Sequence, residues 1–342
     1  MNEARRATSA DVARRAGVSR ATVSYVLNDR QDQTIPESTR QRVRAAAHEL
    51  GYTPNAAARS LRAGRSQLVL LVNNGIPLGP AMSRIVDALT AEVAAAGLSL
   101  VLWQRTSDGP VSALSATLAH VDPAVIITLG APADAERALI EQSGLPVVDT
   151  GIAGDSPEGN LPSRLQVEHL VQRGHQRIGV LSSAAPALAQ FAALRTEGTR
   201  VACRAAGLPD PVVAAVPTGD LMSVATVTEV LAGWRSGPEP VTAVCCYNDY
   251  VAVAVLAAAA ALGLAVPQEL AVIGVDDEPF ARATQPPLTS LALDTATIAR
   301  NVWSRVSRQL DSHGGSPRAD APEPTAPMDS EAAFRLVPRE ST

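Results

Sequence analysis

The chain has 342 residues, of which 46% are hydrophobic, and a formal net charge of −5. This length predicts a small domain joined to a larger body rather than a single core. No apolar run combines the length and the flanking residues of a membrane span, and the N-terminus lacks the apolar core of a signal peptide. We therefore expect a cytoplasmic protein without membrane contact.

The charge is unevenly distributed along the chain. Residues 1–65 contain 12 Arg and 6 Asp or Glu, a net charge of +6, which leaves −11 for the remainder. A basic head on an acidic body is typical of a protein that binds duplex DNA through its head. The three cysteines, Cys203, Cys245 and Cys246, are odd in number and lack the spacing of a zinc site. We expect buried, reduced thiols and no metal or other cofactor.

Two short helices are predicted near the N-terminus. Thr8 and Asp11 have the spacing of a capping box, and Gly17 ends the helix that they open. Ser19 is placed to cap a second helix, residues 20–27, whose apolar residues fall at helical spacing. This pattern predicts a helix-turn-helix. The outer face of its second helix carries side chains that suit base edges and phosphates, namely Arg20, Ala21, Thr22, Ser24 and Tyr25.

A third helix, residues 36–50, is predicted to close the small helical core. After this helix, residues 52–64 have a composition that favours a short helix. They contain one large apolar residue, Leu61, among small and basic ones. Residues 11–24 and 52–64 together resemble the lactose-repressor (LacI/GalR) family of bacterial transcription regulators. Both motifs occur in the order and at the spacing of that family.

The resemblance implies a sequence-specific DNA-binding transcriptional regulator, a repressor, that binds a palindromic operator in double-stranded DNA as a homodimer. It also implies a small-molecule effector, with a sugar as one candidate. Arg20, Ala21 and Tyr25 would read base edges, while Thr22 and Ser24 would hold phosphates. The other residues for which the resemblance implies DNA contacts are Thr8, Ser19, Asn28, Asn55, Ala58, Arg59 and Leu61. Leu61 would wedge into the minor groove, and its hinge segment would fold only on DNA.

From residue 66 onward, buried strands alternate with helices. Four strands, at residues 68–72, 98–103, 124–129 and 145–148, belong to a first set, and a second set extends to residue 275. Two such runs predict an α/β body of two doubly wound parallel-sheet lobes, which resembles the periplasmic-binding-protein-like type. One helix of the second lobe is expected at residues 196–206. Ligands of such lobe pairs lie in the cleft between them, at the carboxyl ends of the strands.

The expected domain boundaries follow from these patterns. They are a head at 1–53, a hinge helix and linker at 54–65, and a body at 66–340 of two interleaved lobes, approximately 66–160 plus 291–312 and 161–290 plus 328–340. Residues 311–327 are rich in Pro, Ser and Gly and read as a disordered insertion.

The resemblance implies a ligand site at Arg195, Asn248 and Asp276. A guanidinium, an amide and a carboxylate can together satisfy vicinal hydroxyls. The chain departs from the family at residues 73–77, where an Asp-containing loop is usual, and at residues 158–162. Leu221 and Val275 stand where relatives carry aromatic residues. With 3% aromatic residues overall, a stacking platform for a pyranose is poorly supplied, so a ligand other than a common sugar stays open.

Enzymatic activity is not expected. The acidic run at residues 276–278 has no phosphate-binding loop, nucleophile elbow or metal-spaced histidine pair beside it, and His169 and His175 suit capping or packing at the ends of a helix. The alternative to a regulator is a cytoplasmic small-solute-binding protein with an incidental basic head. Arg20, Tyr25 and Leu61 discriminate between the two, because a solute binder has no use for a reading helix beside a hinge.

Overall fold

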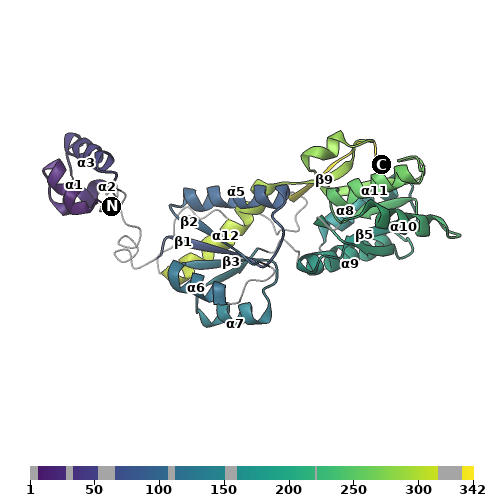
Figure 1. Cartoon of the computed structure of the whole chain (residues 1–342), viewed down its shortest axis with the longest axis horizontal. Helices are drawn as coiled ribbons and strands as arrows, with labels where there is room; N and C mark the ends of the chain where they lie inside the picture. Colours follow the sequence, from purple (N-terminus) through teal and green to yellow (C-terminus); the bar gives the residue numbers. More distant parts are fainter. Residues whose placement is uncertain are drawn as a thin grey trace, which may run out of the picture. The chain divides into compact units, whose positions relative to one another are not determined.

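A computed structural model describes residues 7–27, 34–52, 66–106, 112–150, 160–219, 222–314 and 333–342. The chain divides into two compact units, Met1–Gln67 and Leu68–Thr342, and we call them the head and the body (Figure 1). In the described residues, no helix is long and apolar enough to cross a membrane.

The head contains the helices α1 (Ser9–Ala16), α2 (Arg20–Leu27) and α3 (Glu37–Glu49). The predicted capping box of α1 is present: Thr8 N donates to Asp11 Oδ2 at 3.0 Å, and Asp11 N donates to Thr8 Oγ1 at 3.4 Å. Gly17 then adopts the left-handed conformation, φ 67°, that ends α1. Ser19 caps α2, because its Oγ accepts a hydrogen bond from Thr22 N at 3.0 Å.

Valines from all three helices form the core of the head. Val12, Val23 and Val43 are at most 1% exposed. Each such buried side chain contributes about 1.5–3 kcal/mol to folding. An ion pair between Arg15 and Glu49, 2.8 Å long, also joins α1 to α3. The head therefore holds α2 rigidly with one face turned inward.

The body contains two sheets. The first has the order β2-β1-β3-β4 with every pair parallel. Its strands are β1 (Leu68–Asn73), β2 (Ser99–Gln104), β3 (Val125–Leu129) and β4 (Val147–Asp149). Helices α5 (Pro80–Ala95) and α12 (Thr295–Gly314) cover the face that carries Leu71 and Ile127. Helices α6 (Ser112–Val121) and α7 (Asp134–Gln142) cover the opposite face, which carries Leu70 and Ile126.

The second sheet has the order β10-β9-β8-β7-β5-β6, and only β10 runs antiparallel to its neighbour. Its strands are β5 (Ile178–Ser183), β6 (Val212–Val216), β7 (Ala243–Cys246), β8 (Ala271–Asp276), β9 (Thr289–Leu293) and β10 (Phe334–Val337). Helices α8 (Leu161–Gln172) and α9 (Ala189–Ala205) cover one face. Helices α10 (Val224–Arg235) and α11 (Asp249–Ala261) cover the other. The predicted pair of doubly wound lobes is thus confirmed.

Three predicted boundaries were wrong. Residues 291–293 were expected in the first lobe, but they belong to β9 and pair with β8 and β10 in the second sheet. The helix expected at 196–206 begins seven residues earlier, since the 3-10 turn Pro186–Leu188 leads directly into α9. Residues 311–314 were expected in a disordered insertion, but they form the last turn of α12.

The cysteines behave as the sequence predicts. Cys203, Cys245 and Cys246 are free and buried. Cys245 and Cys246 pack into different hydrophobic clusters because neighbours on a strand face opposite sides of the sheet. Burial raises the pKa of Cys203 to about 11, so its thiol stays protonated and unreactive at neutral pH.

Candidate functional site

The outer face of α2 is available for contact. Arg20 and Ala21 are exposed, and Ser24 and Tyr25 are half-buried, whereas Val23 packs into the core of the head. Thr22 is half-buried as well, and its hydroxyl lies 2.9 Å from Ser19 Oγ within the cap of the helix. The predicted side chains of α2 are thus exposed or half-buried, whereas Val23 between them is buried.

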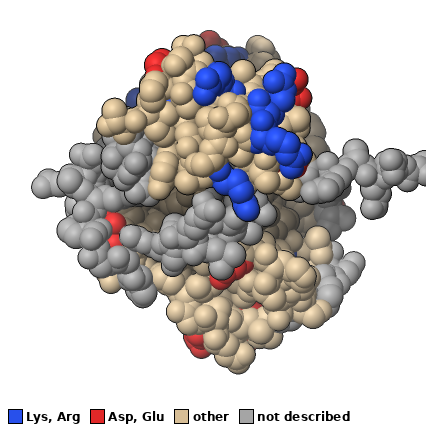
Figure 2. All heavy atoms as spheres, turned by 90° about the vertical axis from the view of Figure 1, so that its left-hand side faces the viewer, with Lys and Arg blue, Asp and Glu red and all other residues tan. Residues whose placement is uncertain are grey.

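The head also carries exposed basic side chains. Arg20, Arg42 and Arg44 are exposed on the head, and the side chain of Arg14 is 78% exposed. Several arginine side chains lie close together on the surface that Figure 2 shows. Such a group of guanidinium ions suits the phosphates of a DNA backbone. Thr8 is exposed at the start of α1. Five residues with predicted DNA contacts lie outside the described residues, namely Asn28, Asn55, Ala58, Arg59 and Leu61.

The body has a cavity of about 170 Å³ between its two lobes. The cavity is lined by the three residues for which the resemblance implied a ligand site. Arg195 comes from α9, Asn248 follows β7, and Asp276 ends β8. The carboxyl ends of two neighbouring strands thus meet helix α9 at the cavity. Together they bring residues that are up to 81 positions apart in the sequence to one site.

Arg195 and Asn248 are held by short-range contacts. The guanidinium of Arg195 lies 4.8 Å from the centroid of the Tyr247 ring and also donates to the carbonyl oxygen of Tyr247. Asn248 is the N-cap of α11, and its Oδ1 accepts a hydrogen bond from Val251 N at 3.0 Å. This contact fixes the orientation of the Asn248 amide, whose Nδ2 is a hydrogen-bond donor that suits a ligand.

Asp276 has an unusual backbone conformation and an unusual pKa. Its φ of 105° lies in the left-handed region that costs energy for a residue with a side chain, and such strain is often found at functional sites. Burial raises the pKa of Asp276 to about 6, although the nearby Arg195 opposes that shift. In the described part of the chain, no donor hydrogen-bonds its carboxylate, which leaves both oxygens for a ligand.

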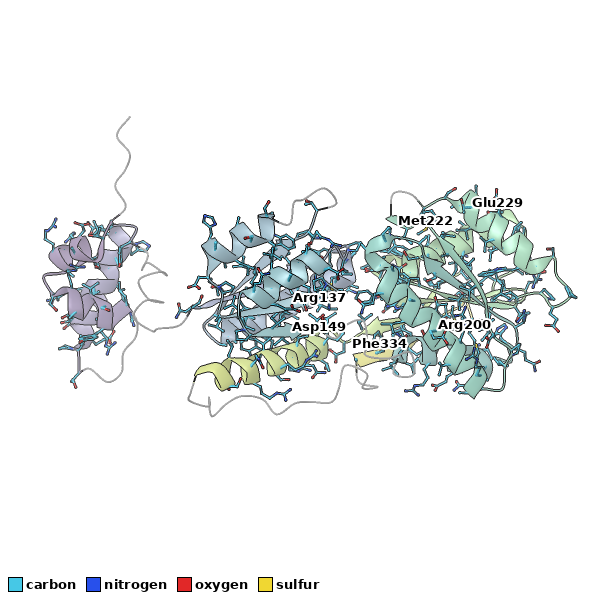
Figure 3. All side chains as sticks on the ribbon, turned by 90° about the horizontal axis from the view of Figure 1, so that it is seen from below. Arg137, Asp149, Arg200, Met222, Glu229 and Phe334 are labelled. Atoms are coloured by element: carbon cyan, nitrogen blue, oxygen red, sulfur yellow. The ribbon has the colours of Figure 1, made fainter. Side chains whose placement is uncertain are left out.

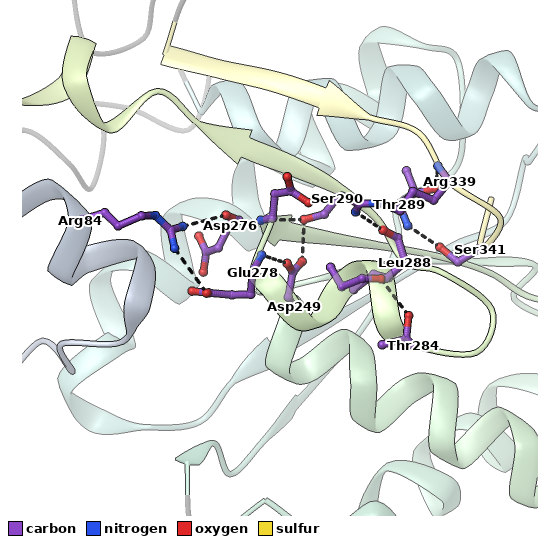
Figure 4. Close-up of polar contacts among 12 residues, drawn as sticks. Arg84, Asp249, Asp276, Glu278, Thr284, Leu288, Thr289, Ser290, Arg339 and Ser341 are labelled. Carbon is purple, nitrogen blue, oxygen red and sulfur yellow. Dashed lines mark hydrogen bonds and ion pairs between the residues drawn. The ribbon is translucent and has the colours of Figure 1, made fainter.

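A buried carboxylate, that of Asp249, makes hydrogen bonds next to the end of β8. Asp249 is fully buried, with Ser290 Oγ donating to its Oδ1 at 2.6 Å and Glu278 N donating to its Oδ2 at 2.7 Å (Figure 4). Burial raises the pKa of Asp249 to about 7 despite these hydrogen bonds. Sequence reasoning missed this support, because its partners lie 29 and 41 residues away.

The acidic run 276–278 divides between two directions, at a turn in which Asp276 and Asp277 have φ values of 105° and 46°. Asp276 and Glu278 both line the cavity. Asp277 instead accepts a hydrogen bond at 2.6 Å from Arg339, outside the cavity. Sequence reasoning did not single out Glu278 as a residue of the cavity.

The loop after β1 supplies part of the first-lobe wall. Asn73 Nδ2 donates to Ile76 O at 2.8 Å, and Ile76 N donates back to Asn73 Oδ1 at 2.8 Å. This pair of hydrogen bonds fixes the loop so that Ile76 and Pro77 line the cavity. The departure from the family at residues 73–77 therefore places apolar side chains where a polar loop was usual.

The expected shortage of aromatic side chains was wrong for the cavity itself. Few aromatic residues occur in the chain, but Phe191, Tyr247 and Phe334 all line this one site. Phe334 lies where the two halves of the body adjoin (Figure 3). Aromatic side chains next to polar groups suit a ligand with both apolar and hydroxyl-bearing surfaces.

The two histidines have structural contacts. His169, in the last turn of α8, lies with its Nε2 2.8 Å from Thr342 Oγ1, and His175 Nδ1 lies 3.1 Å from Thr242 Oγ1. Burial lowers the pKa of both, which favours neutral rings. This agrees with the prediction that they pack at the ends of a helix.

Known proteins share both parts of this architecture. Residues 8–55 match the family model of bacterial regulatory proteins of the lacI family, and residues 167–342 match a periplasmic binding protein-like domain. The HTH-type transcriptional regulator CelR of Thermobifida fusca is 32% identical over 321 residues, which cover 88% of this chain and 91% of that protein. The chain belongs to the lacI family of bacterial regulatory proteins. It is a DNA-binding transcriptional regulator.

Two further relatives of this lacI-family chain show how far the similarity extends. The ribose operon repressor of Escherichia coli (strain K12) is 32% identical over 297 residues, which cover 83% of this chain and 87% of the repressor. A crystal structure of the lac repressor dimer bound to operator and the anti-inducer ONPF covers 98% of both chains, with 26% identity and a TM-score of 0.73. These named relatives are transcriptional regulators rather than enzymes.

Proposed function

We propose that this lacI-family regulator represses transcription from a palindromic operator, and that a small polar ligand in the cleft of the body controls its affinity for that operator. The observation that carries the ligand part is the meeting of Arg195, Asn248 and Asp276 at one cavity. Such a guanidinium, amide and carboxylate can bind vicinal hydroxyls of a sugar or a related metabolite.

On the DNA side, α2 is proposed to enter the major groove. Arg20, Ala21 and Tyr25 would contact base edges, and Thr22 and Ser24 would contact phosphates. The support for this assignment is the exposure of Arg20 and Ala21 on a helix that the head holds rigidly. Thr8 and Ser19, at the starts of the two helices, are proposed to contact the backbone nearby. A protein with this role acts in the cytoplasm, where bacterial DNA lies.

A homodimer follows from the same proposal. One reading helix covers only a few base pairs, and a twofold protein on a palindrome doubles the contacts. The lac repressor structure named above is likewise a dimer on its operator. We therefore expect two copies of this chain per operator, related by a twofold axis.

Coupling between the sites requires a difference in affinity. A ligand changes DNA binding only if it binds one arrangement of the lobes more tightly than the other, and such coupling is typically about 1–3 kcal/mol. The cavity is lined by residues of both lobes, so a ligand there would contact both.

The proposal is tested by selecting fragments of the organism's own genome with the full-length protein and then screening metabolites for release. We expect the selected fragments to share one palindromic motif, and a soluble polar metabolite to release them. Asp276→Ala should abolish release while operator binding without ligand is retained. Selection of fragments without any common motif would instead favour the solute-binding alternative.

A further inference from the structure

The first helix of the body lacks a cap from its own segment. The N-cap residue of α5 is Gly79, which has no side chain, and Pro80 follows it. The first turn of a helix has backbone N–H groups without a partner inside the helix. Ala81 N finds one across the cleft: it donates to Glu278 Oε1 at 3.0 Å. A carboxylate at a helix N-terminus is also favoured by the helix dipole.

A second contact lies one turn further along α5. Arg84 Nη1 is 3.6 Å from Glu278 Oε2, and Arg84 Nη2 donates to the backbone oxygen of Asp276 at 3.3 Å (Figure 4). The side chain of Glu278 is 1% exposed, whereas that of Arg84 is 41% exposed. Among the described residues, Glu278 Oε2 has no hydrogen-bond donor, so the ion pair with Arg84 is its main compensation.

These contacts connect the two lobes at the ligand site itself. Ala81 and Arg84 belong to a helix on the first sheet, whereas Asp276 ends a strand of the second sheet and Glu278 follows that strand. We propose that Arg84 and Glu278 are further positioning residues of the ligand site, which fix the backbone of Asp276 and hold the lobes together before any ligand binds. This inference rests on the proposed function for the role of Asp276.

The physical reason is the cost of separating the partners. If the lobes separate, the hydrogen bond between Ala81 N–H and the Glu278 carboxylate breaks, and both groups must be hydrated. The hydrogen bond from the Arg84 guanidinium to the main-chain oxygen of Asp276 breaks as well. The left-handed backbone of Asp276 then loses an external constraint. A ligand that contacts Asp276 therefore acts at the junction that these contacts hold together.

Amide exchange of Ala81 tests the cap directly. First-turn amides of a helix usually exchange fast, but the contact with Glu278 should protect Ala81 in the ligand-free protein. Glu278→Ala should reduce this protection by about tenfold or more, because a hydrogen bond to a charged group is lost. Glu278→Gln should keep most of the protection, since its amide oxygen still accepts from Ala81. An unprotected Ala81 in the wild-type protein would overturn the proposal.

The distance between the lobes tests whether the contacts of Glu278 and Arg84 hold the lobes together. Spin labels on exposed Ala135 of α7 and exposed Ala232 of α10 report one lobe each. The native cysteines are buried, so only introduced cysteines react. Mixing with unlabelled protein limits the signal to pairs within one chain. Glu278→Ala and Arg84→Ala should shift the distance distribution to longer values and broaden it.

A matched control removes an ion pair within one lobe. Arg204 makes two hydrogen bonds to Asp210, of 2.8 and 2.9 Å, and both residues belong to the second lobe. Arg204→Ala should leave the distances unchanged. Identical distance distributions in Glu278→Ala and wild type would contradict the proposal that Glu278 holds the lobes together. An equal shift in Arg204→Ala would contradict it too. These measurements use the ligand-free protein without DNA, so they stand or fall independently of operator selection.

Discussion

Gly274 on β8 leaves the space in which the carboxylate of Asp249 lies: a Cβ at position 274 would be 2.0 Å from Asp249 Oδ1. The first prediction is that Gly274→Ala destabilises the body, by about 1–3 kcal/mol in urea unfolding, because the buried carboxylate must move away from Ser290 and Glu278. Gly233→Ala is the control, since Gly233 lies in α10 with nothing within 4 Å of an added Cβ. It should stabilise by roughly 0.5–1 kcal/mol. Equal stability of both variants would contradict the packing argument.

Asp249 also predicts a pH dependence of stability. Its pKa is about 7 in the folded protein against 3.8 for an unperturbed aspartate, so the folded state binds more protons between these values. Its contribution to the free energy of unfolding is therefore present below about pH 4 and lost as the pH rises through about 7. The free energy of unfolding of Asp249→Asn, compared with that of wild type, should therefore rise as the pH increases through this range.

Asp294 is the control of opposite sign. It accepts hydrogen bonds from the backbone and side chain of Thr297 at 3.0 and 2.7 Å, and these lower its pKa. Its contribution is present at neutral pH and lost as the pH falls through its lowered pKa. Asp294→Asn should therefore be less stable than wild type at pH 7. A difference between Asp249→Asn and wild type that does not change from pH 4 to 8 would contradict the assignment.

Asp276 predicts how ligand affinity depends on pH. The pKa of its carboxyl is about 6, and the ionised form accepts hydrogen bonds from ligand hydroxyls best. Affinity for the releasing metabolite should fall as the pH drops through about 6, by up to about tenfold per pH unit. Calorimetric titration from pH 5 to 8 measures this, and Asp276→Asn should remove the dependence. Asp134→Asn, exposed on α7, should retain it.

Leu61 carries a prediction that rests on the family resemblance alone, because it lies outside the described residues. Leu61→Ala should weaken binding to the selected palindrome and reduce the bend of the bound DNA, since an apolar wedge in the minor groove is lost. Non-specific binding, which depends on phosphates, should hardly change. A gel-phasing assay with the same bend in both proteins would rule out the wedge.

Local signals made the head and the order of strands predictable. The spacing of Thr8 and Asp11 and the position of Gly17 specify the ends of α1 within a few residues. Periodicity also predicted strands β1 to β8, because buried parallel strands read as continuous apolar runs, whereas β9 was not predicted. The early start of α9 had no such signal, since the alanine-rich residues before Thr196 carry no side-chain cap.

The candidate site was predictable only in part. Arg195, Asn248 and Asp276 were found through motifs, and the structure brings them to one cavity. The contact of Glu278 with Ala81 spans 197 residues and leaves no trace in either local sequence. The gathering of Phe191 and Phe334 in the cavity likewise depends on tertiary packing, because composition reports how many aromatic residues occur and not where they meet.

The most direct measurement of the account is the affinity of wild type and Arg20→Ala for the selected palindrome and for every single-base-pair variant of one half-site. An arginine that reads a guanine contributes roughly 1–3 kcal/mol of discrimination. Arg20→Ala should lose the sequence preference at one base pair per half-site and keep the preference at the others. Arg14→Ala, which changes an exposed side chain of α1, should keep all of these preferences. An equal loss of affinity of Arg20→Ala for all sequences would make Arg20 a phosphate contact and contradict the assignment of α2 as the reading helix.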